Sequence, residues 1–334
     1  MHYRTLGRTG IQVSPLAIGA MMFGAFGNAD HDDVVRIIHR ALDAGINLID
    51  TADVYSAGES EEIVGKALLG RRDDVVLATK FGNPMGQGPN RRGASRRWIV
   101  TEVENSLRRL QTDYIDLYQY HRPDTETDLE ETLSALTDLV RSGKVRAIGS
   151  SRQPAADIVE AQWIAERRGY ERFRCEQPAY SILDRGIERD VLPVTQRYGM
   201  GAIVWSPLAQ GLLTGRVRKG KPSELRRGGT YHAHLADERR IDAAEELIAL
   251  ADKAGMPLTH LAVAFVTAHP GVTAALLGVR TMEQLDDLLA GADVVLTPEI
   301  LDQIDEIVPP GTDVGRLDMA YDPPSVTDPA LRRR

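Results

Sequence analysis

The stretch LIDTADVYSAGESEEIVGKAL, residues 48–68, begins as an apolar strand and ends as an amphipathic helix. Asp50 and Tyr55 lie at the junction between the two. A strand that enters a buried core should not end on a carboxylate unless that group has a partner or a chemical task. The stretch therefore indicates a strand–helix unit in which Asp50, at the end of the strand, has a bonding partner or a chemical role.

The same unit recurs along the whole chain. Short runs that are apolar at both odd and even positions predict strands covered on both faces. They lie at residues 15–20, 47–53, 75–82, 115–121, 145–151, 174–180, 201–207 and 274–279. Helical patterns follow at residues 32–44, 59–69, 98–110, 130–142, 154–168, 187–198, 239–254 and 281–290. Eight units without a compositional break predict an α/β protein, a single closed (β/α)8 TIM barrel over residues 1–334; a doubly wound sheet is the alternative.

Several segments lie outside the repeat. Residues 4–14, RTLGRTGIQVS, predict a β-hairpin that turns at Gly10 and covers the barrel floor. A long connection over residues 208–238 follows the seventh strand. We expect extra C-terminal helices, including one over residues 257–269, and a solvated tail over residues 310–334.

The composition excludes several classes of protein. The formal net charge of −8 argues against nucleic acid or an anionic membrane as the main partner. No apolar run approaches the roughly 20 residues that span a bilayer, and the N-terminus lacks a signal-peptide core. The one cysteine, Cys175, excludes an internal disulfide and is consistent with a reducing compartment. We therefore expect a cytoplasmic protein that acts on a small molecule, and a homo-oligomer is compatible with this composition.

Polar side chains converge at the ends of three neighbouring predicted strands. In a TIM barrel the inward residues at the C-terminal strand ends build the active site. Strand alternation places Asp50, Lys80 and His121 at the same mouth, with Tyr55 on the loop above Asp50. Each residue alone would more often be a cap, a solvated strand end or a packing residue. Their joint position at equivalent strand ends favours a catalytic group.

The chemistry of these four side chains is mutually supportive. A tyrosine is a poor acid at neutral pH unless a neighbouring cation favours its phenolate. Lys80 supplies that cation for Tyr55, and Asp50 would hold the lysine charged. His121 could donate a hydrogen bond to the same oxygen that Tyr55 protonates. The arrangement suits protonation of an oxyanion as it forms, so the missing component is a nucleophile or a hydride.

The motifs resemble those of the aldo-keto reductase superfamily over nearly the whole chain. Residues 47–68 resemble the segment around the superfamily's catalytic Asp and Tyr. VLATKFG (76–82) resembles its lysine strand, and DYIDLYQYHRPD (113–124) its histidine strand. The resemblance implies reduction of an aldehyde or ketone by hydride transfer from nicotinamide C4 of NADPH, bound without a Rossmann fold. The implied catalytic tetrad is Asp50, Tyr55 as general acid, Lys80 and His121.

The resemblance also implies how the cofactor is held. GSSRQ (149–153), WSPLAQGLLTG (205–215) and GVRTMEQLDDLL (278–289) resemble the superfamily's nicotinamide, pyrophosphate and adenosine segments. The implied cofactor-binding residues are Ser151, Arg152, Gln177, Trp205, Ser206, Leu208, Gln210, Gly211, Gly278, Arg280, Gln284 and Asp287. Arg280 could pair with a 2′-phosphate, which favours NADPH over NADH.

Some positions depart from the commoner family pattern. Arg152 stands where Asn is frequent, and in this it resembles the potassium-channel β subunits of the same superfamily. Trp205 replaces a frequent Tyr but keeps a flat ring. An alternative function is therefore an NADP(H)-binding regulatory or sensor subunit with little turnover. Hydrolysis by Asp50 and Asp53 is a weaker alternative, because strand alternation points these side chains to opposite faces.

Substrate walls in this fold come from loops. The candidate apolar contacts with a carbonyl substrate are Met22, Phe23, Phe26 and Trp98. Four arginines after the third strand would favour an anionic substrate, although a solvated loop is their commoner role: Arg91, Arg92, Arg96 and Arg97. His232 and His234 have a His-x-His spacing without a third ligand, so we expect no metal site.

Overall fold

A computed structural model describes residues 1–221, 233–317 and 321–333. Eight parallel strands close into a barrel in the order β10-β3-β4-β5-β6-β7-β8-β9. The strands are β3 (Leu16–Gly19), β4 (Leu48–Asp50), β5 (Val76–Phe81), β6 (Ile115–Tyr120), β7 (Val145–Ser151), β8 (Phe173–Gln177), β9 (Gly201–Val204) and β10 (Ala274–Leu277). The TIM-barrel prediction is confirmed, and the doubly wound alternative is wrong because the last strand pairs with the first.

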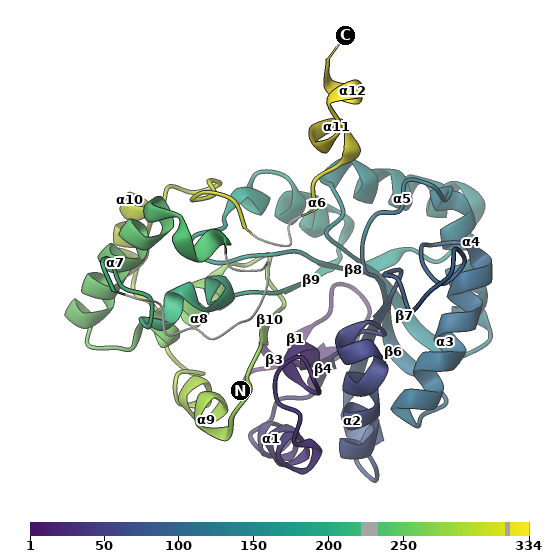
Figure 1. Cartoon of the computed structure of the whole chain (residues 1–334), viewed down its shortest axis with the longest axis horizontal. Coiled ribbons are helices and arrows are strands. Elements are labelled where there is room, and N and C mark those ends of the chain that lie inside the picture. The colour runs from purple at the N-terminus through teal and green to yellow at the C-terminus, as the bar shows by residue number, and fades with distance from the viewer. Residues whose placement is uncertain (222–232, 318–320, 334) are drawn as a thin grey trace.

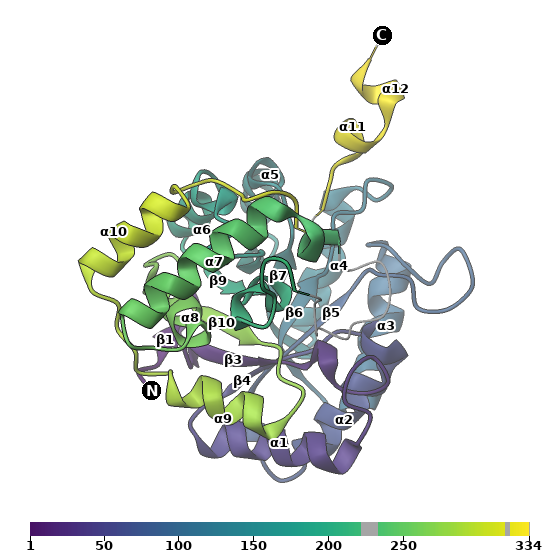
Figure 2. The same ribbon diagram turned by 60° about the vertical axis from the view of Figure 1, so that its left-hand side comes forward.

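Helices form a layer around the barrel (Figures 1 and 2). They are α1 (His31–Asp43), α2 (Glu59–Ala67), α3 (Arg96–Leu110), α4 (Leu129–Arg141), α5 (Ala155–Arg168), α6 (Val191–Tyr198), α7 (Glu238–Lys253), α8 (Leu258–Ala268), α9 (Met282–Ala290) and α10 (Pro298–Ile307). Helix α1 shows why they form, because its buried residues Val34, Ile37, Ile38 and Ala41 lie on one helical face. The Asp30 side chain caps its first turn by accepting from the Asp33 amide.

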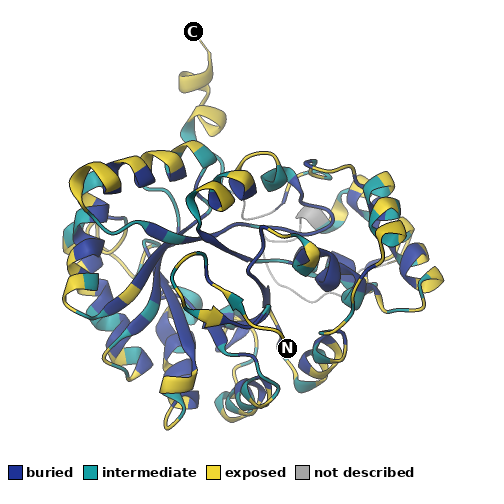
Figure 3. Cartoon of the chain, turned by 180° about the vertical axis from the view of Figure 1, so that it is seen from behind, coloured by how far each residue is buried: buried dark blue, intermediate teal, exposed yellow. Residues whose placement is uncertain are grey.

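The barrel floor is closed by the predicted hairpin of β1 (Arg4–Thr5) and β2 (Gln12–Val13). Leu6 and Val13 are fully buried and join the apolar cluster that fills the barrel, which also contains Leu48 and Cys175. Burial of a Leu or Val side chain is worth about 1.5–3 kcal/mol, so the hairpin is firmly held. Figure 3 shows the buried strands at the centre and the exposed outer faces of the helices.

The C-terminal part holds elements whose bounds the sequence patterns did not give. Helix α10 begins at Pro298, and the Thr297 side chain accepts from the Ile300 amide as its cap. The short helices α11 (Pro324–Thr327) and α12 (Pro329–Arg332) project from the barrel in both views (Figures 1 and 2). Residues 222–232 of the long connection lie outside the described residues. Within the described ranges, no helix is long and apolar enough to cross a membrane.

Candidate active site

A buried ion pair lies at the open end of the barrel. Asp50 ends β4 opposite Ala78, and Lys80 lies two residues further along β5, on the same side of the strand. The Nζ of Lys80 contacts the Asp50 carboxylate and donates to the Thr51 carbonyl oxygen at 2.9 Å. Burial acts to lower the pKa of Lys80, but the charge of Asp50 and contacts with Asp50 and Tyr55 outweigh it, so this pKa is raised. Lys80 is therefore a fully buried cation.

The second oxygen of Asp50 is held by two amide side chains. Gln119 of β6 and Gln177 of β8 each donate to Asp50 Oδ2 at 2.8 Å, and Gln177 also donates to Gln119 Oε1 at 3.1 Å. A buried carboxylate is tolerated only when it is paired and hydrogen-bonded. These donors fix the carboxylate across the barrel, a role that the sequence did not assign to Gln119.

Tyr55 opens a tight turn, η2 (Tyr55–Gly58), between β4 and α2. Its phenolic oxygen accepts from Lys80 Nζ at 3.2 Å. Ser56 and Ala57 have positive φ angles of 49° and 56°, which L-residues rarely adopt. The Ser56 hydroxyl holds this turn, because it accepts from the Phe26 amide at 3.1 Å. The turn therefore presents the phenol to the buried ammonium.

His121 completes the cluster from the end of β6. Its ring meets the Tyr55 ring edge-on, with centroids 5.8 Å apart, and Asn83 Nδ2 lies 2.9 Å from His121 Nδ1. Burial and the nearby charges of Lys80, Arg152 and Arg122 lower the pKa of His121 well below its ordinary value. The imidazole is therefore neutral at neutral pH. The structure thus brings together all four residues that the sequence singled out.

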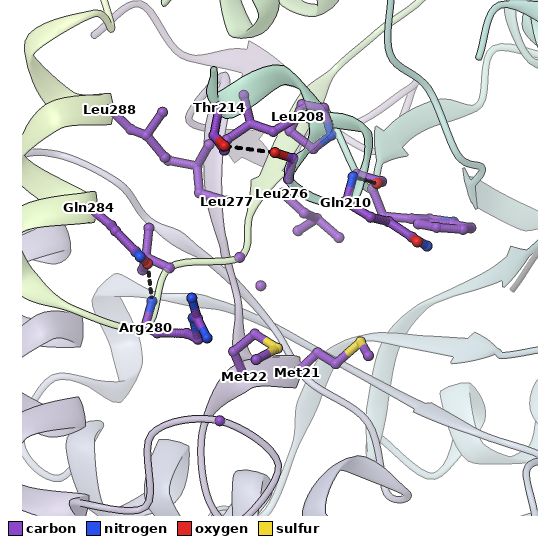
Figure 4. A pocket seen from close by; sticks show the side chains of 18 of the residues that line it. Met21, Met22, Leu208, Gln210, Thr214, Leu276, Leu277, Arg280, Gln284 and Leu288 are labelled. Atoms are coloured by element: carbon purple, nitrogen blue, oxygen red, sulfur yellow. Dashed lines mark hydrogen bonds between the residues drawn. The ribbon is translucent and has the colours of Figure 1, made fainter. Parts of the chain in front are cut away.

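A cleft of about 720 Å³ runs from this cluster to α9. It is lined by every predicted cofactor residue except Ser151, namely Arg152, Gln177, Trp205, Ser206, Leu208, Gln210, Gly211, Gly278, Arg280, Gln284 and Asp287. Figure 4 shows Met21 and Met22 on one side and Leu208, Gln210 and Thr214 on the other. Ser151 does not line the cleft. It is buried, and its hydroxyl donates to the backbone carbonyl oxygen of Gln177 at 2.8 Å.

A buried carboxyl supports the Arg152 turn. Arg152 has a positive φ of 60°, and its guanidinium lies 5.0 Å from the Trp205 ring. Glu176 accepts from the Ser150 hydroxyl at 2.5 Å and from the Gln153 amide at 3.1 Å. Burial raises the pKa of Glu176 to about 7, although these hydrogen bonds act to lower it. The turn that carries Arg152 therefore rests on a group that titrates near neutral pH.

The residues that line the cleft include groups suited to a dinucleotide. Trp205 offers a flat ring, and its Nε1 is buried without a hydrogen-bond partner in the described part of the chain. Arg216 and Arg280 line the cleft, and the guanidinium group of an arginine matches phosphate geometry. A Cβ added at Gly278 would meet open space. A nicotinamide dinucleotide fits these residues.

Several lining residues were missed by the sequence analysis. They are Gly19, Met21, Ala25, Gly27, Pro207, Thr214, Arg216, Pro257, Thr259, Leu276, Leu277, Val279 and Leu288. Arg216 could have been noticed as a cation just after WSPLAQGLLTG, a segment that resembles the pyrophosphate-binding one. Of the others, Gly19 lies in β3, Leu276 and Leu277 in β10, Thr259 in α8 and Leu288 in α9, and the rest lie in the connecting segments. All of them are uncharged, so none has a chemical signal of its own.

The predicted substrate contacts divide into two pairs. Met22 and Phe26 line the cleft. Phe23 is 0% exposed and Trp98 is 5% exposed, and neither lines it. Trp98 instead packs in the first turn of α3, where Ser95 caps the helix. The structure therefore brings only Met22 and Phe26 to the space in front of Tyr55.

Other charged residues of the sequence analysis have structural partners. Arg96 pairs with Asp138 at 2.6 Å and Glu131 at 3.3 Å, which ties α3 to α4. Asp53 is fully buried, and burial together with Glu61 and Glu102 raises its pKa well above the ordinary value. The carboxylates that influence Asp53 are thus those of Glu61 and Glu102, and Asp50 is not among them.

Metal ligands do not gather in the described ranges, where no group of three His, Cys, Asp or Glu side chains could hold an ion. His232 and the side chain of His234 lie outside the described residues.

Comparisons with known proteins agree with this geometry. A sequence model described as the Aldo/keto reductase family matches residues 15–309. The uncharacterized oxidoreductase YrpG of Bacillus subtilis is 41% identical over 322 residues, which are 92% of this chain and 96% of that protein. A probable voltage-gated potassium channel subunit beta of Oryza sativa is 38% identical over 322 residues, 92% and 97% of the two chains. The aldo-keto reductase YhdN of Bacillus subtilis is 37% identical over 296 residues, 86% and 88% of the two chains.

Proposed function

The chain belongs to the aldo/keto reductase family, and from this premise we propose that it is an NADPH-dependent oxidoreductase that reduces an aldehyde or ketone to an alcohol. The observation that carries the proposal is the contact of Lys80 with both Asp50 and Tyr55, beside His121, at the end of a cleft of dinucleotide size. Such a cluster suits proton delivery to an oxygen on which negative charge develops.

The cofactor would supply a hydride from nicotinamide C4 to the carbonyl carbon. Arg152 and Gln177 would hold the carboxamide, and the Trp205 ring would stack on the nicotinamide. Arg216 and Arg280 would bind phosphate groups. The remaining predicted residues of the cleft would complete the binding site, with Gln284 and Asp287 at its adenosine end.

Tyr55 would act as the general acid. The Lys80 ammonium, 3.2 Å from the phenolic oxygen, stabilises the phenolate that remains once the proton has moved to the substrate oxygen. Asp50 keeps Lys80 charged and in place, because a buried ammonium without a counter-ion would lose its proton. His121 would donate a hydrogen bond to the same substrate oxygen and orient it. Met22 and Phe26 would contact the apolar part of the substrate.

Replacement of Tyr55 with Phe tests the mechanism. The variant keeps the ring but loses the proton, so we expect kcat to fall at least about 10²-fold while NADPH affinity stays nearly unchanged. A steady-state screen of NADPH oxidation against varied aldehydes and ketones measures kcat, and quenching of protein fluorescence measures cofactor affinity. Wild-type turnover in this variant would refute the role of Tyr55.

The preference for NADPH rests on the charge of Arg280. A guanidinium in the cleft favours a cofactor with an additional phosphate group. Parallel fluorescence titrations with NADPH and NADH measure this preference. Equal affinity for the two nucleotides would contradict it.

A second candidate function is a cofactor-binding regulatory subunit with little turnover. It is favoured by relatives named as probable voltage-gated potassium channel subunits beta from Oryza sativa and Arabidopsis thaliana, and by the Arg152–Trp205 pair. This function predicts tight retention of NADP(H) and negligible reduction of every carbonyl in the screen. The complete cluster of Asp50, Tyr55, Lys80 and His121 leads us to prefer catalysis.

A further inference from the structure

Asn83 lies two residues beyond the end of β5 and contacts His121. The two atoms that meet, at 2.9 Å, are the amide nitrogen Nδ2 of Asn83 and the ring nitrogen Nδ1 of His121. An amide nitrogen carries two hydrogens and accepts no hydrogen bond, so the ring nitrogen must be the acceptor. An accepting ring nitrogen carries no proton.

The second ring nitrogen of His121 must then carry the proton. Among the described residues, the titratable and charged groups that face this ring come from four segments: Tyr55 after β4, Lys80 of β5, Arg122 after β6 and Arg152 after β7. No carboxylate is among them, and a neutral imidazole has one N–H group. With Nδ1 accepting from Asn83, that group is Nε2–H. In the described part of the chain, Nε2 has no hydrogen-bond partner.

We propose that Asn83 is a positioning residue that holds His121 in its Nε2-protonated tautomer, ready to donate to the substrate oxygen. The opposite tautomer would direct the Nε2 lone pair at the carbonyl oxygen and repel it. The assignment of the tautomer rests on the contact of the two side chains alone. Its catalytic consequence rests on the proposed carbonyl reduction.

The tautomer can be read without any turnover. Long-range ¹H–¹⁵N correlation spectra of the full chain, labelled with ¹⁵N-histidine, distinguish a protonated Nε2 from a protonated Nδ1. The spectrum of a His121→Gln variant identifies the signals of His121 by their loss. We expect a neutral, Nε2-protonated ring throughout pH 6–8. A protonated Nδ1 in the wild-type chain would overturn the proposal.

Replacement of Asn83 with Asp tests the consequence. A carboxylate accepts from Nδ1–H, so the variant should hold the opposite neutral tautomer, and only the imidazolium form would still present Nε2–H. At pH 8 we expect kcat/KM for aldehyde reduction to fall about 10²-fold and to recover as the pH is lowered. The wild-type chain should show no such recovery on the acid side. NADPH affinity should stay within about twofold, because Asn83 does not line the cleft.

Asn90→Asp is the matched control, since it makes the same change at an exposed position of the same loop. It should leave the pH profile and the His121 tautomer as in the wild type. A pH profile of Asn83→Asp parallel to the wild-type profile, in a variant whose thermal unfolding is unchanged, would overturn the positioning role. Absence of carbonyl reduction by the wild-type chain would refute the proposed function instead, while the spectra still report the tautomer.

Discussion

At the residue scale, the structure explains why a carboxylate ends an apolar strand. Asp50 accepts from Lys80, Gln119 and Gln177, which come from three different strands of the barrel. Removal of one partner from a buried ion pair typically costs about 3–5 kcal/mol, because the other charge stays buried. The fold therefore contains a charged group that is stable only when its partners are assembled around it.

Glu176 gives the protein a specific dependence of stability on pH. Its pKa is raised from 4.5 to about 7 in the folded chain. Between these pH values the folded chain holds a proton that the unfolded chain has released, so the free energy of unfolding falls as the pH rises. The interval corresponds to about 3 kcal/mol. We expect Glu176→Gln to remove this part of the pH dependence.

Urea unfolding of both chains at pH 5, 6 and 8 measures the effect of Glu176. Groups common to both chains cancel in the difference, so the wild type should lose up to about 3 kcal/mol relative to Glu176→Gln between pH 5 and pH 8. Parallel curves for the two chains would show that Glu176 does not hold its proton in this interval.

The four residues of the active-site cluster could be identified from the sequence, whereas the roles of Gln119 and Asn83, which bond to them, could not. Alternation along β4 and β5 is enough to place Asp50 and Lys80 on one face. The position of Asn83 depends on the conformation of a loop with several glycines, which no periodic pattern determines. Phe23 and Trp98 were expected at the substrate wall for their apolar character, but the same character also favours the burial that the structure shows.

At the element scale, the turn that carries Tyr55 is braced by α3. Arg109 of α3 reaches Glu61 of α2 at 2.6 Å and Glu102 at 2.5 Å, so its side chain is fixed from two sides. A Cβ added at Gly58, whose φ is 101°, would lie 2.8 Å from Arg109 Cδ. The turn therefore has room for glycine alone at this position.

We expect Gly58→Ala to destabilise the fold by about 1–3 kcal/mol, and to lower kcat by displacing Tyr55 while cofactor affinity is retained. Gly70→Ala is the matched control, because Gly70 also has a positive φ, 76°, but a Cβ there would meet no atom within 4 Å. Denaturant unfolding and steady-state kinetics are measured for both variants. Both report the strain of a positive φ at alanine, and only Gly58→Ala adds the close contact with Arg109. An equal loss of kcat in both would contradict the bracing role.

The predicted elements agree with the structure where apolar periodicity is strong. All eight strands and the helices between them are found close to their predicted bounds. One predicted helix, residues 187–198, is divided into η4 (Gly186–Glu188) and α6, because Asp190 adopts a non-helical conformation and begins α6 anew. Helix α10 lay outside the strand–helix repeat, and only its Thr-Pro start marked it.

At the scale of the whole molecule, the count of strand–helix units was enough to predict the barrel. Closure requires β10 to pair with β3, and the register Leu276↔Ala17 shows this pairing. The cleft could not be predicted in the same way, because its walls come from segments about 250 residues apart in sequence. Asn28, in the loop after β3, donates to the carbonyl oxygen of Arg280 at 2.8 Å, so the loop after β3 is held against the segment after β10.

The hairpin at the barrel floor bears on how ligands would reach the cleft. Leu6 and Val13 close the floor of the barrel, so the proposed cofactor and substrate would both enter from the opposite end, where the cleft lies. We expect an ordered mechanism. The reduced nucleotide, which extends along the cleft, would bind first, and the alcohol would leave before the oxidised nucleotide. Product-inhibition kinetics would show oxidised nucleotide competing with reduced nucleotide, and the alcohol failing to do so. Competition by both products would indicate independent routes.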